Sequence, residues 1–102
     1  MPIYNKLVRD KIPDIIIAEG KTATTTILTH DEYYKALVAK LHEEVQEFAE
    51  SDSIEEIADI LEVIDAIITA KGVTKDQINT IQEQKRTERG GFEKRILLLE
   101  VL

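Results

Sequence analysis

LHEEVQEFAESDSIEEIADILEVIDAI, residues 41–67, decides the fold, because it combines an apolar repeat with ten carboxylates in twenty-seven positions. Its apolar residues recur three and four positions apart, which places them on one face of an α-helix. The short polar break Ser51-Asp52-Ser53 divides the repeat into two helices. Two long helices joined by so short a break favour an antiparallel helical hairpin.

Helix starts are marked by capping boxes, in which a hydroxyl residue is followed three positions later by Glu or Gln. The boxes lie at Thr29/Glu32, Ser53/Glu56 and Thr74/Gln77. They predict helices over about 30–50, from 53 to about Lys71, and from 74 to about 88. Gly72 stands in the usual position just beyond a helix C-terminus.

The segments outside the hairpin are assigned from their propensities. Residues 13–19 (PDIIIAE), followed by Gly20, predict a short helix, with proline near its start and glycine past its end. TATTTIL at 22–28 is β-branched and alternating, which favours a strand. ILLLEVL at 96–102 is an apolar run that forms either a strand or a docked tail. We expect one mainly α domain over 1–102, with a small strand pair from these two segments.

Composition excludes several classes of protein. A chain of 102 residues forms about one small domain, and 43% hydrophobic against 5% aromatic residues predicts an aliphatic core. No cysteine means no disulfide and no thiolate metal site, and two histidines argue against zinc. No apolar run approaches the roughly 18 residues of a membrane span, and the first residues lack the apolar region of a signal peptide. We expect a soluble, cytoplasmic protein without membrane contact.

The charge of the chain is acidic and unevenly distributed. A net charge of −7 argues against nucleic acid as a partner, because such binding relies on a basic surface. Within 31–70, twelve acids accompany only Lys35 and Lys40. Basic residues gather toward both ends of the chain, among them Lys6, Arg9, Lys11, Lys85, Arg86 and Arg89. This segregation fits either simple charge balance or a metal site beside a phosphate site.

Each long helix carries a pair of acids at the edge of its apolar face. At about 100° per residue, the first apolar stripe centres near Leu41 and Val45, and Glu43 falls opposite it, in water. The edge pairs are Glu44 with Glu47, and Glu56 with Asp59. An antiparallel hairpin brings the two pairs together around one small space.

Four neighbouring carboxylates repel one another, and partial burial increases the repulsion, so they protonate or recruit a cation. Oxygen ligands without His or Cys select a hard ion, Mg²⁺ or Mn²⁺ before Zn²⁺. The sequence therefore indicates a magnesium site in the hairpin as one interpretation of these acids.

Simpler interpretations stay open. Acidic stripes on helices are commonly solvated, and Glu56 already has a role as a capping partner. Lys40 fits an ion pair with Glu44 better than a catalytic base, while His30 and His42 fit a turn and a boundary position. The alternatives to an enzyme are a non-enzymatic acidic helical interaction module and a divalent-ion sensor.

Three motifs resemble a known family. EEVQE at 43–47 followed by EIAD at 56–59 looks like the EExxE…ExxD signature of the all-α, MazG-like nucleoside triphosphate pyrophosphohydrolases, a group that includes phosphoribosyl-ATP pyrophosphohydrolase. YNKLVRDKIPDII at the start and KRTERGGFEKRILL near the end resemble a short-chain branch of that group. The chain departs from larger members in its spacer, since only eight residues separate Glu47 from Glu56.

The resemblance implies a function and its residues. The metal ligands would be Glu44, Glu47, Glu56 and Asp59, the same four that the helical angles select. The implied reaction is Mg²⁺-dependent hydrolysis of a nucleotide between its α and β phosphates, giving a monophosphate and pyrophosphate. Glu47 and Glu44 are the expected catalytic residues, with Glu47 accepting the proton of the attacking water. The expected phosphate-binding residues are Lys6, Arg9, Lys11, Lys85, Arg86 and Arg89.

Two expectations concern surfaces. A lone hairpin leaves most of its apolar stripe uncovered, so we expect a homodimer or higher homo-oligomer that pairs hairpins into a four-helix bundle, as in that family. The candidate base-stacking residues, for each of which packing is the alternative, are Tyr4, Tyr33, Tyr34 and Phe92.

Overall fold

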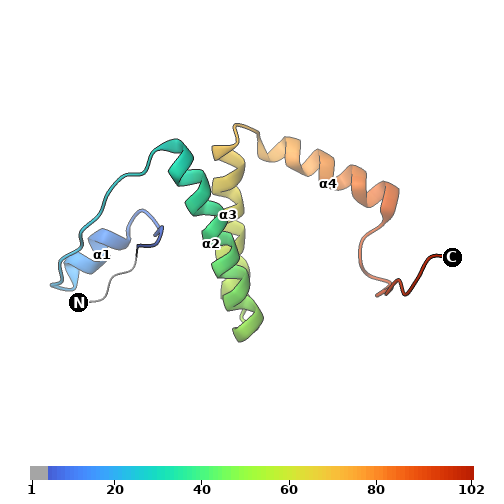
Figure 1. Cartoon of the computed structure of the whole chain (residues 1–102), viewed down its shortest axis with the longest axis horizontal. Coiled ribbons are helices and arrows are strands. Elements are labelled where there is room, and N and C mark those ends of the chain that lie inside the picture. Colours follow the sequence, from blue (N-terminus) through green and yellow to red (C-terminus); the bar gives the residue numbers. More distant parts are fainter. Residues whose placement is uncertain (1–4) are drawn as a thin grey trace. The chain divides into compact units, whose positions relative to one another are not determined.

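A computed structural model describes residues 5–102, so Tyr4 lies outside the described residues. Within 5–102 every regular element is a helix (Figure 1). The helices are α1 (Ile12–Ala18), α2 (His30–Ser51), α3 (Ile54–Ala70) and α4 (Lys75–Arg89). The chain divides into two compact units, Met1–Gly72 and Val73–Leu102, and each is described by itself. The prediction of a mainly α chain is confirmed.

The predicted strand pair is wrong. Neither 22–28 nor 96–102 forms a strand in the described structure. Strand propensity is expressed only where a second strand supplies hydrogen bonds and a neighbouring face to bury against. The two segments belong to different units, and the side chains of 96–102 are all exposed, so the tail is not docked within its own unit either.

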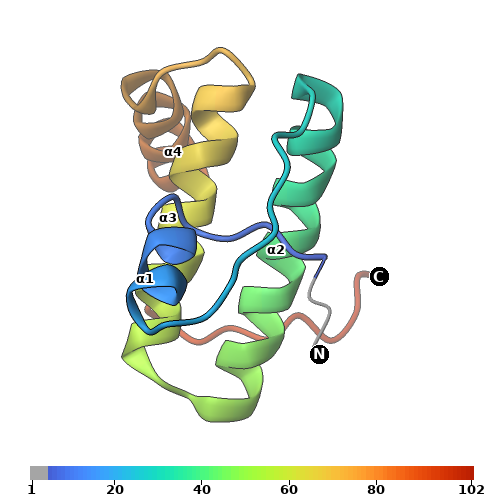
Figure 2. The same cartoon turned by 90° about the vertical axis from the view of Figure 1, so that its left-hand side faces the viewer.

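The antiparallel hairpin of α2 and α3 is the framework of the first unit (Figure 2). Asp52 ends α2 in the left-handed conformation, with φ of 55°, and its N–H donates to the carbonyl of Phe48. Aspartate tolerates this conformation better than bulkier residues, because its short polar side chain bonds locally. Ser53 is extended and begins α3, so the chain reverses within two residues.

Two of the three capping boxes form as predicted. Thr29 and Glu32 satisfy each other's backbone N–H groups at the start of α2, and Thr74 and Gln77 do the same at the start of α4. Such caps contribute about 1 kcal/mol each.

The box predicted at Ser53 and Glu56 is wrong. The hydroxyl of Ser53 accepts from the N–H of Glu55 at 3.2 Å and donates to the Glu55 carboxylate at 2.6 Å. The backbone N–H of Ser53, which Glu56 was expected to accept from, donates to the hydroxyl of Ser51 at 3.3 Å instead. The carboxylate of Glu56 is left for another use.

The buried face of α2 is rotated from the predicted one. Among residues 5–102, the buried apolar side chains are Leu37, 3% exposed, and Val63, 9% exposed. Val45, predicted near the centre of the stripe, is 49% exposed, whereas Glu44 is buried. The packed face thus runs from Leu37 toward Glu44, because α3 contacts α2 on that flank.

The amino-terminal arm, residues 5–11, leads into α1. Pro13 lies in the first turn of α1, where its missing N–H is not needed, and Gly20 follows the helix with φ of 83°. The predicted short helix is confirmed with its start one residue earlier. In the second unit, α4 ends at Gly90, also with positive φ, and the exposed tail follows.

No helix in the described part of the chain combines the length and the apolar character that crossing a membrane requires.

Candidate functional site

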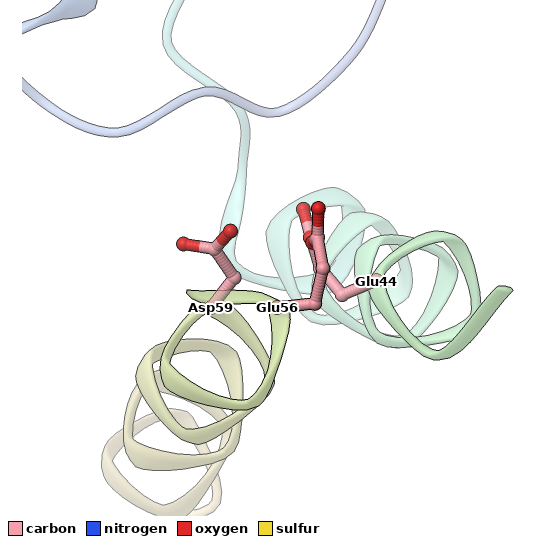
Figure 3. A group of neighbouring side chains, drawn as sticks. All are labelled: Glu44, Glu56 and Asp59. Carbon is pink, nitrogen blue, oxygen red and sulfur yellow. The ribbon is translucent and has the colours of Figure 1, made fainter. Parts of the chain in front are cut away.

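Carboxylates from both hairpin helices meet in the half next to the turn. One oxygen each of Glu44 on α2 and of Glu56 and Asp59 on α3 lie within 4.8 Å of one another. In Figure 3 the three carboxylates point to the same side of the hairpin, toward the blue amino-terminal segment. The fold thus brings together three of the four predicted metal ligands.

This meeting follows from helix geometry and the short turn. Glu56 and Asp59 are three residues apart, so they share one face of α3. The reversal at Asp52 and Ser53 folds the second half of α2 back along the first half of α3, which carries Glu44 opposite that face. We refer to Glu44, Glu56 and Asp59 as the carboxylate cluster.

The cluster contains buried oxygens without partners. Glu44 is only 6% exposed. Its Oε2 and the Oε2 of Glu56 are both buried, and neither has a hydrogen-bond partner among the described residues. A buried polar atom without a partner costs about 1–3 kcal/mol, and native structures keep few of them. Two such atoms in one cluster indicate a place for a proton or a cation.

The electrostatics of the cluster point the same way. Burial raises the pKa of Glu44, and the neighbouring carboxylate of Glu47 raises it further, although Lys40 opposes this. Burial also raises the pKa of Glu56 to about 7, with the charge of Glu47 as the next cause. Without a cation, the cluster therefore holds protons more tightly than ordinary carboxylates do.

Glu47, the fourth predicted ligand and the predicted base, borders the cluster. It lies one turn beyond Glu44 on α2, is half-buried, and falls outside the group whose oxygens lie within 4.8 Å. Its charge nevertheless acts on the pKa of both Glu44 and Glu56. Its roles as ligand and as base stay predictions.

Lys40 joins the cluster to its neighbour Glu43. Its Nζ lies 3.5 Å from Oε1 of Glu44 and 3.6 Å from Oε2 of Glu43. The predicted ion pair of Lys40 with Glu44 is present. The prediction that Glu43 faces water is wrong, because the rotated face of α2 leaves this residue half-buried beside two lysines.

The amino-terminal arm supplies two more cations. Arg9 Nη2 lies 2.7 Å from Oδ1 of Asp59, and Lys6 Nζ lies 3.1 Å from Oε1 of Glu43. The hydrogen bond of Lys6 holds the pKa of Glu43 below its usual range. The sequence predicted that both cations bind phosphate, but it did not reveal their carboxylate partners, Asp59 and Glu43. Partners 37 and 50 residues away leave no trace in local spacing.

A cavity of about 440 Å³ opens beside the cluster, between the arm, α1 and the hairpin. Its charged lining consists of three cations and four acids, which are Arg9, Lys11, Lys40, Asp10, Glu44, Asp59 and Glu62. Its apolar lining includes Ile12, Ile15, Leu37, Val63 and Ala66, with the ring of Tyr33. Of the candidate stacking residues in the described range, Tyr33 is the one that lines this cavity.

The open end of the hairpin holds a second hollow of about 390 Å³. There the His30 Nε2 atom lies 3.0 Å from the carbonyl oxygen of Ala70, which ties the start of α2 to the end of α3. Lys71 donates to the Tyr34 hydroxyl at 3.4 Å and lies 5.4 Å from its ring centroid. His30 thus begins a helix and links two helices rather than serving only a turn.

The remaining predicted cations lie in the second unit. Lys85, Arg86 and Arg89 are on α4, and their side chains are exposed. Arg86 and Arg89 stand in its last turn, where cations favour the negative end of the helix dipole. Phe92 is 96% exposed. A phosphate-binding role for the three cations stays a prediction.

The residues of the cluster fit a hard divalent ion. All donors are carboxylate oxygens, which Mg²⁺ and Mn²⁺ prefer, and two of them are buried without partners among residues 5–102. A bound cation would remove the repulsion that raises the pKa of Glu44 and Glu56. The chemistry of the donor set and the orphaned atoms therefore agree.

Comparison with known proteins adds one relative. The chain is 50% identical over 48 residues to an uncharacterized protein of Mycolicibacterium smegmatis (strain ATCC 700084 / mc(2)155). The match covers 47% of this chain and 49% of the relative, so it spans about half the length of each. No family model matches the chain. No solved structure matches it.

Proposed function

We propose that the chain is a Mg²⁺-dependent nucleotide pyrophosphohydrolase, which cleaves a nucleoside triphosphate or related nucleotide between the α and β phosphates. The observation that carries the proposal is the pair of buried oxygens of Glu44 and Glu56 that have no hydrogen-bond partner among residues 5–102, in a cluster that borders a cavity lined by cationic, acidic and apolar side chains. A nucleotide has the matching parts, since its phosphates are anionic and its base is flat and apolar on both faces.

The ligands of Mg²⁺ would be Glu44, Glu47, Glu56 and Asp59, and Mn²⁺ would fit the same oxygens. When bound, the ion supplies polarisation of phosphate oxygens and acidification of water. Glu47 borders the cluster and is our candidate to accept the proton of the attacking water. Burial and the ion pair with Lys40 fix the position of Glu44, which would be the second catalytic residue of the carboxylate cluster.

The cations near the cluster would bind the phosphates. Arg9 and Lys11 line the cavity, and Lys6 lies on the same arm beside Glu43. Lys85, Arg86 and Arg89 lie on α4 in the other unit, and a phosphate-binding role for them stays a prediction from the sequence. The base would occupy the apolar part of the cavity, against the ring of Tyr33.

The exposed apolar residues of the hairpin support a homodimer or higher homo-oligomer as part of the proposal. Side chains at least one third exposed within the described structure include Val38 and Val45 on α2 and Ile54, Ile57 and Leu61 on α3. A second hairpin packed on these faces would complete a four-helix bundle. A monomeric hydrodynamic mass at full activity would contradict this part.

The proposal also concerns the location and the partner of the protein. A cytoplasmic location would agree with a nucleotide as substrate, and the net charge of −7 favours a free nucleotide over a nucleic acid as the partner.

The deciding experiment measures pyrophosphate release from a panel of NTPs, dNTPs and phosphoribosyl-ATP with Mg²⁺. Release should disappear in Glu44→Gln and Asp59→Asn and persist in Glu50→Gln, an exposed acid on α2 outside the cluster. Metal binding without release would favour the divalent-ion sensor. Neither binding nor release would favour the helical interaction module.

A further inference from the structure

The arm lies against the acidic half of the hairpin through two ion pairs that join distant parts of the chain. Arg9 reaches Asp59 across 50 positions, and Lys6 reaches Glu43 across 37. Both cations are more than half exposed, at 56% for the Arg9 side chain and 53% for that of Lys6. Exposed pairs of this kind hold weakly and exchange readily.

The three acids of the cluster differ in their partners. Glu44 and Glu56 each keep a buried oxygen without a hydrogen bond in the described structure, whereas Asp59, the acid nearest the arm, already receives a guanidinium. Arg9 thus supplies one of the positive charges that the cluster requires. It does so through a half-exposed contact, and Arg9 also lines the cavity.

Building on the proposed function, we propose that Arg9 has two alternative partners: Asp59 in the ion-free protein, and a phosphate of the substrate once a divalent ion occupies the cluster. The ion and Arg9 compete for Asp59 because both are cations seeking the same carboxylate. Arg9 itself lines the cavity, and the planar fork of its guanidinium suits two phosphate oxygens.

The exchange of Arg9 between Asp59 and phosphate couples binding of the divalent ion to binding of the substrate phosphate. While no ion is bound, Arg9 partly neutralises the cluster and is withheld from anions. Binding of the ion frees Arg9 beside the newly neutralised cluster, which then attracts phosphate from two sides. The ion and the phosphate would consequently bind more tightly together than either binds alone.

The test is a pair of binding measurements on Arg9→Gln, with Lys11→Gln as the matched control for the first, which uses the ion alone. Lys11 lies on the same arm and lines the same cavity, and no ion pair of Lys11 is recorded among residues 5–102. Calorimetry with Mn²⁺ alone should show affinity about two- to fivefold tighter in Arg9→Gln than in the wild type, because a competing cation is gone. Lys11→Gln should change it by less than half as much.

The second measurement uses methylenediphosphonate, a non-hydrolysable diphosphate without a base, in saturating Mn²⁺. Its affinity should fall about tenfold in Arg9→Gln, the opposite direction to that of the ion. Arg9→Lys, which keeps the charge but not the fork, should leave Mn²⁺ affinity near wild type and give intermediate diphosphonate affinity.

Two outcomes would overturn the proposal. Equal effects of Arg9→Gln and Lys11→Gln on Mn²⁺ would mean that net charge alone acts, and unchanged diphosphonate affinity in Arg9→Gln would remove the phosphate partner. Neither measurement depends on turnover. Failure of pyrophosphate release with the expected binding shifts would therefore reject the hydrolase and leave the exchange of Arg9 in place.

Discussion

The two ends of the α2–α3 hairpin differ in whether their polar groups have hydrogen-bond partners. At the open end, His30 meets the carbonyl of Ala70 and Lys71 meets Tyr34, so neighbouring groups satisfy one another. At the end next to the turn, Glu44 and Glu56 retain buried oxygens without partners in the described structure. A chain selected only to fold would satisfy both ends, which suggests that the turn end is kept for a ligand.

Glu44→Gln should have the largest effect, because it should lower activity and at the same time raise the stability of the metal-free protein. Loss of a ligand should lower pyrophosphate release about 100-fold or more. Removal of a buried charge should raise the free energy of unfolding of the metal-free protein by about 1 kcal/mol. Release assays and urea denaturation in EDTA measure the two effects. A destabilised, inactive variant would instead mean that Glu44 is structural.

Leu37→Ala should destabilise both ends together, since Leu37 is the most buried apolar side chain among residues 5–102. Truncation in a packed core costs about 2–4 kcal/mol. Ile17→Ala, at a 57% exposed position on α1, should cost less than 1 kcal/mol and serves as the control. Thermal unfolding monitored by circular dichroism separates the two. Equal losses would show that the hairpin core lies elsewhere.

The turn end should also make stability depend on pH in the metal-free protein. The pKa of Glu56 rises from 4.5 to about 7 on folding, chiefly through burial, so between these values the folded chain binds more protons than the unfolded one. The contribution of Glu56 to the free energy of unfolding is therefore fully present below pH 4.5 and is lost as the pH rises toward 7. Glu44 contributes with the same sign.

Melting temperatures in EDTA at pH values from 5 to 7.5 should accordingly fall as pH rises, and Glu56→Gln should flatten the curve. Millimolar Mg²⁺ should restore stability at the upper end of this range, because the ion replaces the lost protons. A curve that rises with pH in EDTA would contradict the assignment of the raised pKa to the cluster.

His30→Ala should give the smallest effect, confined to the open end. Loss of the contact with Ala70 should lower the free energy of unfolding by about 0.5–1.5 kcal/mol and leave Mn²⁺ affinity unchanged. His42→Ala, an exposed position on the same helix, is the matched control. An effect of His30→Ala on Mn²⁺ binding would show that the two ends are coupled.

Sequence alone determined the features that rest on neighbours along the chain. The capping boxes at Thr29 and Thr74, the reversal at Asp52 and the proline at the start of α1 depend on interactions within about four residues. Their residue patterns can therefore be recognised in the sequence. The pairing of Glu56 with Asp59 on one face is likewise fixed by helical spacing.

Only the tertiary structure decided which carboxylates are buried and which cations they meet. The packing of α3 rotated the buried face from Val45 to Glu44. Arg9 found Asp59 across 50 positions, a pairing that no local pattern encodes. Burial and long-range charge contacts depend on distances in space, which exist only after the helices have packed.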